Sequence, residues 1–318
     1  MKWKNILLAC MLTAGLAHAE LTSEFQGVEG NKEADIKSLM GKLDTIGFST
    51  VTVNEHIEEF YFNKFKEKGT EMYSFFALAN IDKLRPLLLA NPDFGAYAPF
   101  NFLVYKTLDK KTDDNTWFGH LSSDTMLDII GEKNADTRKE FSSMIEGLDA
   151  LVNKEMKPTK TKKFERTAAL PAKGLVKFVK KFDKPDDLEE WIETFVGDHD
   201  GRFAKQNFII AGFIDLKFEY EDRELEFDKY DAYWVSLLCH FEFSNSIFNR
   251  GIPEAGMFAP CSVYFYIPKG TNELHVGYAS VDNWISALNF SDQKRIDSMK
   301  AIDAEVMEIF TQMGFKKL

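Results

Sequence analysis

The segment Pro92-Asp93-Phe94-Gly95-Ala96-Tyr97-Ala98-Pro99 has a second version later in this chain. That version is Pro253-Glu254-Ala255-Gly256-Met257-Phe258-Ala259-Pro260, which aligns with the first without a gap, proline on proline at both ends. Each version leads into an alternating apolar run typical of a β-strand, over residues 100–105 and 261–267. The repeat therefore predicts two related folding units in tandem.

The likeness continues beyond these strands. A polar turn follows each of them, and then a returning strand centred on Gly119 in the first unit and on Gly277 in the second. An amphipathic helix closes each unit, with Asp136 as a candidate N-cap in the first and Ser291 or Asp292 in the second. Further helices are predicted at the start of each unit, over residues 33–43 and 186–196. The common unit is thus a helix, a strand pair, a short helix, a hairpin and a helix.

The strand pattern also indicates the fold class. Long alternating runs over residues 208–220 and 234–243 predict strands with one buried face, which is typical of antiparallel sheets. We therefore expect an α+β protein of two duplicated domains, each a mostly antiparallel or mixed sheet with helices packed on one face. Because like units can pack face to face as in a dimer, we expect an internal pseudo-dimer.

The domain boundaries follow from the repeat and from the composition between its copies. The ranges are 1–19 for a signal peptide, 20–156 for the first repeat domain, 157–174 for a linker and 175–318 for the second repeat domain. The linker is rich in Lys and Thr, and we interpret it as a solvated segment.

The amino-terminal segment has the layout of a cleavable signal peptide. Lys2 and Lys4 precede an apolar stretch over residues 6–16, and small residues stand at Ala17 and Ala19. This predicts export and a periplasmic location. Cys10 gives a resemblance to a lipoprotein signal, but the apolar run before it is only about four residues, shorter than the roughly seven that such a signal requires. The remaining chain lacks the roughly 18 consecutive apolar residues of a membrane span, so we expect no transmembrane segment in the mature protein.

Charge and motifs exclude several functions. The chain has 50 acidic against 39 basic side chains and a formal net charge of -11, so it repels nucleic acid and we predict no nucleic-acid partner. The sequence contains no phosphate-binding glycine motif, no zincin spacing and no nucleophile elbow, so no cofactor is predicted. A non-catalytic protein is favoured over an enzyme. An enzyme that uses carboxylates with His120 or His275 on the hairpins stays an open alternative.

The two cysteines of the predicted mature chain are the sharpest chemical feature. Cys239 lies in a strand-like run, and Cys261 opens the strand after Pro260. When the alignment of the repeated segment is extended without a gap, their positions in the first unit are Leu78 and Phe100. A structural disulfide, two buried free thiols, and a redox or metal role all stay open. His240 is a weak metal candidate, because neighbours on a strand point to opposite faces.

The second unit resembles a known family. The run Phe258-Ala259-Pro260-Cys261-Ser262-Val263-Tyr264-Phe265-Tyr266, followed by Val276-Gly277-Tyr278 and a helix over 282–288, resembles family 302 of the domains of unknown function. Members often have a Pro-Cys pair entering this strand and an earlier cysteine like Cys239. The first unit is similar over residues 98–105 but departs at both cysteine positions.

The resemblance implies a small α+β fold that tends to pair, here fused in one chain. It implies no established activity, and it therefore transfers no catalytic residue. The leading hypothesis is a periplasmic, non-catalytic tandem-domain protein that binds a small molecule or a protein partner. The alternative is a redox or metal-handling protein that uses Cys239 and Cys261.

Overall fold

The computed structural model describes residues 19–318, so the predicted signal peptide lies outside the described residues apart from Ala19. We call residues 20–166 the first copy and residues 175–318 the second copy. The first copy consists of β1 (Glu20–Glu29), α1 (Glu33–Met40), η1 (Leu43–Ile46), β2 (Ser49–Asn54), α2 (Ile57–Phe65), β3 (Thr70–Ala79), α3 (Ile81–Ala90), η2 (Pro92–Tyr97), β4 (Phe100–Thr107), β5 (Asn115–Gly119), α4 (Ser123–Ile129), α5 (Ala135–Met156) and β6 (Lys160–Arg166).

The second copy repeats this plan. It consists of β7 (Leu175–Lys181), α6 (Leu188–Lys205), β8 (Phe208–Asp215), α7 (Leu216–Asp222), β9 (Tyr230–His240), α8 (Phe241–Ser244), η3 (Asn245–Asn249), η4 (Pro253–Phe258), β10 (Cys261–Pro268), β11 (Glu273–Ala279), α9 (Val281–Ala287), α10 (Gln293–Gln312) and β12 (Lys316–Lys317).

The strand order demonstrates the duplication. The first sheet has the order β2-β3-β4-β5-β1-β6, and the second, read in the same direction, has the order β8-β9-β10-β11-β7-β12. Each strand of the second sheet is thus the counterpart of the strand six places earlier in the chain, and the strand pairs of both sheets are antiparallel. The predicted α+β class with two duplicated sheets is confirmed.

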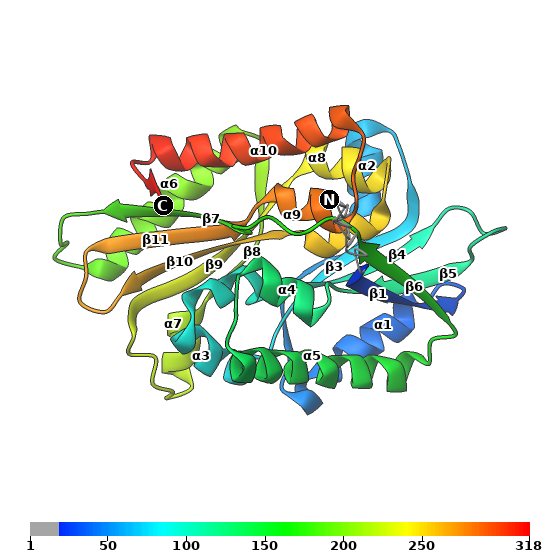
Figure 1. Cartoon of the computed structure of the whole chain (residues 1–318), viewed down its shortest axis with the longest axis horizontal. Coiled ribbons are helices and arrows are strands. Elements are labelled where there is room, and N and C mark those ends of the chain that lie inside the picture. The colour runs from blue at the N-terminus through cyan, green and yellow to red at the C-terminus, as the bar shows by residue number, and fades with distance from the viewer. Residues whose placement is uncertain (1–18) are drawn as a thin grey trace, which may run out of the picture.

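The molecule has four layers. Figure 1 shows α6 and α10 along one outer side, α1 and α5 along the opposite side, and the strands of both sheets between them. One apolar core contains residues of both copies, including Tyr73, Leu103 and Tyr233, while a second core fills the space between the second sheet and α6 and α10. Burial of apolar surface on both faces of each sheet is the main source of stability in such a fold.

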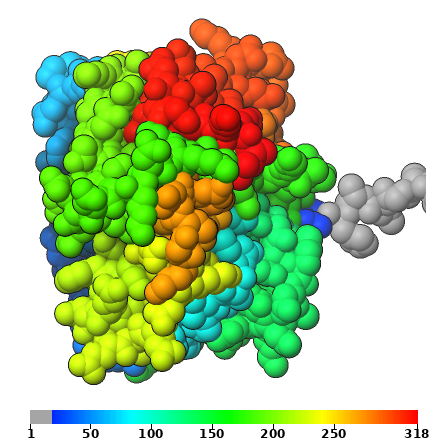
Figure 2. All heavy atoms as spheres, turned by 90° about the vertical axis from the view of Figure 1, so that its left-hand side faces the viewer, coloured from blue at the N-terminus to red at the C-terminus, as the bar shows by residue number. Residues whose placement is uncertain are grey.

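The repeated sequence segment is where the two copies exchange contacts. The Tyr73 hydroxyl of the first copy donates to the Pro253 carbonyl oxygen over 2.5 Å, and the Tyr233 hydroxyl of the second copy donates to the Pro92 carbonyl oxygen over 2.5 Å. The peptide bonds before Pro99 and Pro260 are both cis. Figure 2 shows one end of the molecule, where the orange β10–β11 hairpin lies next to cyan atoms of the first copy.

Glycine is required in both versions of the segment. A Cβ atom at Gly95 would lie 2.1 Å from the Tyr233 hydroxyl oxygen, and one at Gly256 would lie 2.1 Å from the Tyr73 hydroxyl oxygen. Non-bonded atoms cannot approach this closely, so each tyrosine needs a glycine in the facing copy. The reciprocal fit explains why glycine recurs at the fourth position of the repeat.

Two sequence predictions about the sheets are corrected. The segment 157–174, predicted to be a solvated linker, contains β6, which pairs with β1 at the edge of the first sheet. Its lysines are compatible with an edge strand, because charged side chains keep such edges from pairing with other chains. The run 208–220, predicted to be one strand, is β8 followed by α7, because the Asp215 side chain accepts a hydrogen bond from the Phe218 backbone NH and starts a helix.

Smaller differences concern the ends of the copies. Strand β1 was not predicted, and it lies between β5 and β6 in the first sheet. The N-cap of α5 is Asn134 instead of Asp136, whereas α10 is capped by Asp292 as predicted. Within residues 19–318, the helices are all too short or too polar to cross a bilayer.

Candidate functional site

The two predicted site cysteines lie on neighbouring strands, Cys239 at the end of β9 and Cys261 at the start of β10. Both are free thiols, and the strand register places Cys261 opposite Leu238. The register also corrects their counterparts in the first copy. Cys261 corresponds to Phe100, as predicted, but Leu238 corresponds to Leu78, which makes Ala79 the counterpart of Cys239. The reason is that the connection before the repeated segment is one residue longer in the second copy than in the first.

A small cavity adjoins both cysteines. It has a volume of about 40 Å³, and we call it the cysteine pocket. Its wall is formed by Phe208, Leu238, Cys239, His240, Phe243, Ser244, Phe248, Ala259, Cys261, Val263, Tyr278, Ala279, Val281, Trp284, Ile302, Asp303 and Val306. The lining is mainly apolar, which is the usual character of a ligand pocket, although the volume suits a few atoms and not a large ligand.

The first copy has phenyl rings where the second copy has this pocket. Phe100 and Phe102 occupy the positions of Cys261 and Val263, and both rings are buried. The centroid of the Phe100 ring lies 5.5 Å from the imidazole centroid of His120, which is the counterpart of Tyr278. Cysteine and valine are much smaller than phenylalanine, so the second copy retains space that the first copy fills.

Asp303 of α10 is the carboxyl group in the pocket wall. One of its oxygens accepts a hydrogen bond from the Val281 backbone NH over 3.2 Å, and no lysine or arginine among residues 19–318 forms an ion pair with it. Burial raises the pKa of Asp303 to about 7, because the charged form loses hydration that the single backbone donor does not replace. The Tyr278 hydroxyl in the same wall is buried without a hydrogen-bond partner.

The thiols are poor nucleophiles in this environment. Burial raises the pKa of Cys239 to about 11, and burial together with the nearby Cys239 raises the pKa of Cys261 even further. A thiol attacks as its thiolate, so the raised pKa values lower the fraction of each cysteine that can react at neutral pH. His240 accepts a hydrogen bond at Nδ1 from the Phe243 backbone NH over 3.2 Å, and it thereby caps α8.

His120, the hairpin residue considered for catalysis, has both ring nitrogens engaged. Its Nδ1 lies 2.7 Å from the Leu121 carbonyl oxygen, and its Nε2 lies 2.9 Å from Oδ1 of Asp149. Burial opposes protonation, but the charge of Asp149 and the two hydrogen bonds outweigh it and raise the pKa of His120. An imidazolium that donates to two fixed oxygens has no nitrogen left for a metal or for proton transfer to a substrate.

The other hairpin histidine, His275, is not near these groups. Its imidazole stacks on the ring of Tyr266 with 4.8 Å between centroids, and its Nε2 lies 3.6 Å from Glu273. The structure therefore brings Cys239, Cys261 and His240 to one pocket, and it places His120 and His275 elsewhere.

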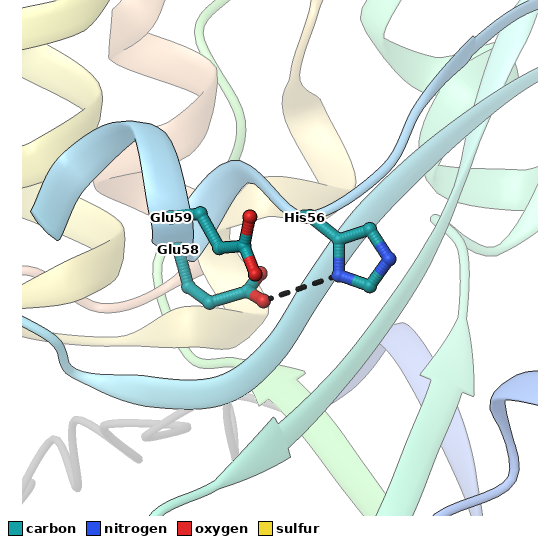
Figure 3. Close-up of side chains that lie close together, drawn as sticks. All are labelled: His56, Glu58 and Glu59. Atoms are coloured by element: carbon teal, nitrogen blue, oxygen red, sulfur yellow. Dashed lines mark hydrogen bonds and ion pairs between the residues drawn. The ribbon is translucent and has the colours of Figure 1, made fainter. Parts of the chain in front are cut away.

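A separate cluster of metal-ligating side chains lies at the start of α2. Figure 3 shows the imidazole of His56 beside the carboxylates of Glu58 and Glu59, with Glu58 joined to the ring. One ligand atom from each residue can be chosen so that all three lie within 4.8 Å of one another. Among residues 19–318, this is the one place where three metal-ligating side chains come so close together. The sequence did not indicate it, because the residues form no zincin motif.

Two cavities of different size border on both copies. A cavity of about 30 Å³ lies where the two versions of the repeated segment meet, bordered by Tyr97, Pro99, Pro260 and Trp284 among others. A volume of this size holds little more than one or two water molecules. A larger cavity of about 320 Å³ lies elsewhere between the copies, with Ile129 and Ile130 of the first copy and Leu175 and Leu318 of the second in its wall.

Comparison with known proteins finds similarity to a solved structure. Neither a protein-family profile nor a curated protein matches the sequence. The solved structure of an uncharacterized conserved protein DUF302 from Bacillus stearothermophilus is similar to part of this chain, with 15% identity and a TM-score of 0.37. The match covers 42% of this chain and 98% of that one. That protein bears the name of the same family of unknown function that the sequence resembles, and the name assigns no activity.

Proposed function

We propose that this protein is exported to the periplasm and binds a small apolar molecule, or the end of an apolar chain, in the cysteine pocket without catalysing a reaction. The observation that supports this most is the difference between the copies. The second copy has Cys261 and Val263 in the pocket wall where the first copy has the larger, buried Phe100 and Phe102, and the cavity of the first copy beside Phe102 and His120 is lined by a different set of elements. The fold therefore does not require the space, and a retained cavity is a cost of roughly 1 kcal/mol or more that ligand contacts would offset.

The chemistry of the wall favours binding over redox or metal chemistry. Because the pKa values of both cysteines are raised by burial, neither thiol is poised to attack a disulfide or to bind a metal ion. An apolar ligand needs no such activation. It gains from the aromatic surface of Phe243, Phe248 and Trp284, which lie in the same wall.

The test grafts the residues of the first copy into the second. We expect the mature chain to bind xenon by 129Xe NMR, and to bind hexanol, whose alkyl end can enter the pocket, saturably in isothermal titration calorimetry. Cys261→Phe introduces the ring that the first copy has at this position, so it should fill the pocket and abolish binding while the fold persists. Cys239→Ala is the matched control, because it introduces the residue of the first copy without filling space, and binding should remain.

Two results would overturn the binding proposal. One is the absence of saturable binding by the unmodified protein, and the other is equal binding by Cys261→Phe. Thiol counting on protein taken directly from the periplasm tests the redox alternative. We expect two free thiols with and without reductant, whereas thiols that appear only after reduction favour the alternative. Export itself predicts a periplasmic protein whose amino-terminal residue is Glu20, and an uncleaved cytoplasmic protein would contradict it.

A further inference from the structure

The loop between β2 and α2 holds a carboxylate whose burial needs an explanation. The side chain of Glu58 is only 2% exposed, and it forms no ion pair with a lysine or arginine among residues 19–318. Its Oε2 accepts a hydrogen bond from the Tyr73 backbone NH over 2.8 Å. Its Oε1 has no partner outside the cluster and lies 3.4 Å from Nδ1 of His56. Buried carboxylates are normally paired with a cation or bound to a metal.

The imidazole of His56 lies between Glu58 and a second carboxylate. Nε2 of His56 lies 3.4 Å from Oε1 of Glu33 on α1, a carboxylate that also pairs with Lys37. The ring therefore lies between two carboxylates, with Nε2 facing Glu33 and Nδ1 facing Glu58. At 3.4 Å the contact between Nδ1 of His56 and Oε1 of Glu58 is a long hydrogen bond, and a metal ion bound to both atoms would take its place.

The distances suit a divalent metal ion. Zinc bonds of about 2.1 Å at tetrahedral angles place two ligand atoms roughly 3.4 Å apart, which is the separation of Nδ1 of His56 and Oε1 of Glu58. Glu59 supplies a third ligand within 4.8 Å, and its exposed side chain is free to turn toward the ion. The carboxylate of Glu33 behind the imidazole is the kind of outer partner that commonly orients a metal-bound histidine.

The second copy shows that the fold does not require these residues. Helix α7 is the counterpart of α2, and it begins at Asp215, whose side chain caps it. Counted from the N-caps His56 and Asp215, Glu58 corresponds to Lys217. A buried acid at this position is therefore a property of the first copy alone.

We propose that His56, Glu58 and Glu59 form a binding site for a divalent transition-metal ion, with Zn²⁺ as the best match to one imidazole and two carboxylates. Nδ1 of His56 and Oε1 of Glu58 are the fixed ligands, the carboxylate of Glu59 completes the protein set, and water takes the open position. The Tyr73 backbone NH holds the other oxygen of Glu58, so the ligating oxygen is oriented before the ion arrives. The site is independent of the cysteine pocket.

Calorimetric titration of the mature chain with ZnCl2 tests the site. We expect one ion per chain, and a rise in thermal stability when the ion is added. His56→Gln and Glu59→Gln, which change side chains that are partly or largely exposed, should each weaken zinc binding at least tenfold without unfolding the protein. Glu58→Gln should weaken it too, but a change at a buried residue can also impair folding, so the other two variants decide the outcome.

A second histidine and carboxylate pair supplies the control. His275 lies 3.6 Å from Glu273, and His275→Gln should leave zinc affinity unchanged. Zinc binding that is equal in His56→Gln and the unmodified protein would overturn the proposal. So would the absence of binding at a zinc concentration of about 100 μM, since a site with three protein ligands should be filled there.

Discussion

The two copies of one fold differ where the first strand of each hairpin begins. In the first copy Phe100 and His120 fill this region, and in the second Cys261 and Tyr278 leave a pocket beside Asp303. The strand order and the reciprocal tyrosine contacts that join the copies are the same, whereas the segment after the second strand of the sheet is α3 in the first copy and the shorter α8 followed by η3 in the second. The difference teaches that the duplicated scaffold does not determine the site, since a few side chains decide whether the same position is packed or open.

The largest expected effect on stability comes from giving the first copy the cysteine that the second copy has at the corresponding position. Phe100→Cys removes a ring that is 4% exposed and packs against Phe48 and His120. We expect a loss of about 4 kcal/mol in the free energy of unfolding, since burying a phenyl ring contributes transfer energy and avoids a cavity. Urea unfolding of the mature chain measures this loss. A cost below about 1 kcal/mol would mean that the first copy is not packed more tightly than the second at this position.

The duplication could be predicted from the sequence, but the residues that differ around the cysteine pocket could be predicted only in part. The repeated segment is recognisable because its glycine position is fixed by the tyrosine of the facing copy in both versions. The counterpart of Cys239 was wrong by one residue, because the connection before the segment is one residue longer in the second copy. Asp303 could not be linked to the cysteines, since no local pattern relates a residue on α10 to strands β9 and β10, which lie far earlier in the chain.

Other errors have local physical causes. The Asp215 cap that begins α7 is a recognisable helix signal, but the apolar alternation around it favoured a strand. Strand β1 pairs with β5 on one side and with β6 on the other. Strands that depend on such tertiary pairing have only a weak local sequence signal. The His120 pair with Asp149 was invisible because the two residues lie on different elements, far apart in the sequence.

The second expected effect concerns the carboxyl group of the pocket. The pKa of Asp303 is raised in the folded protein to about 7 from an ordinary value of 3.8, so the folded state retains a proton that the unfolded chain has lost between these values. Stability therefore decreases as the pH rises from about 4 to 7, and the penalty is complete above pH 7. Asp303→Asn removes the ionisable group, while the amide oxygen still accepts from the Val281 backbone NH.

We expect Asp303→Asn to stabilise the protein by about 3 kcal/mol at pH 8, a value below the roughly 4 kcal/mol of the full shift because water reaches part of the carboxyl group. At pH 4 the variant and the unmodified protein should be equally stable. The corresponding residue of the first copy, counted from the helix caps Asn134 and Asp292, is Ile145. Ile145→Asp is the reciprocal variant, and it should introduce the pH dependence into the first copy. Equal stability of Asp303→Asn and the unmodified protein at pH 8 would refute a buried acid in the pocket.

The smallest expected effect concerns the filled site of the first copy. The pKa of His120 is raised, so its ion pair with Asp149 stabilises the fold below the ordinary histidine pKa near 6.5, and this contribution is lost as the pH rises through the folded value. Asp149→Asn should therefore destabilise the protein by about 1 kcal/mol at pH 5.5 and much less at pH 9. Measuring it in the Asp303→Asn background removes the opposing acid from the pH profile. NMR titration of the His120 ring should show a lower pKa in Asp149→Asn. If the pKa is unchanged, the imidazole is held by its contact with the Leu121 carbonyl oxygen alone, and the charge contrast between the two copies lies entirely in Asp303.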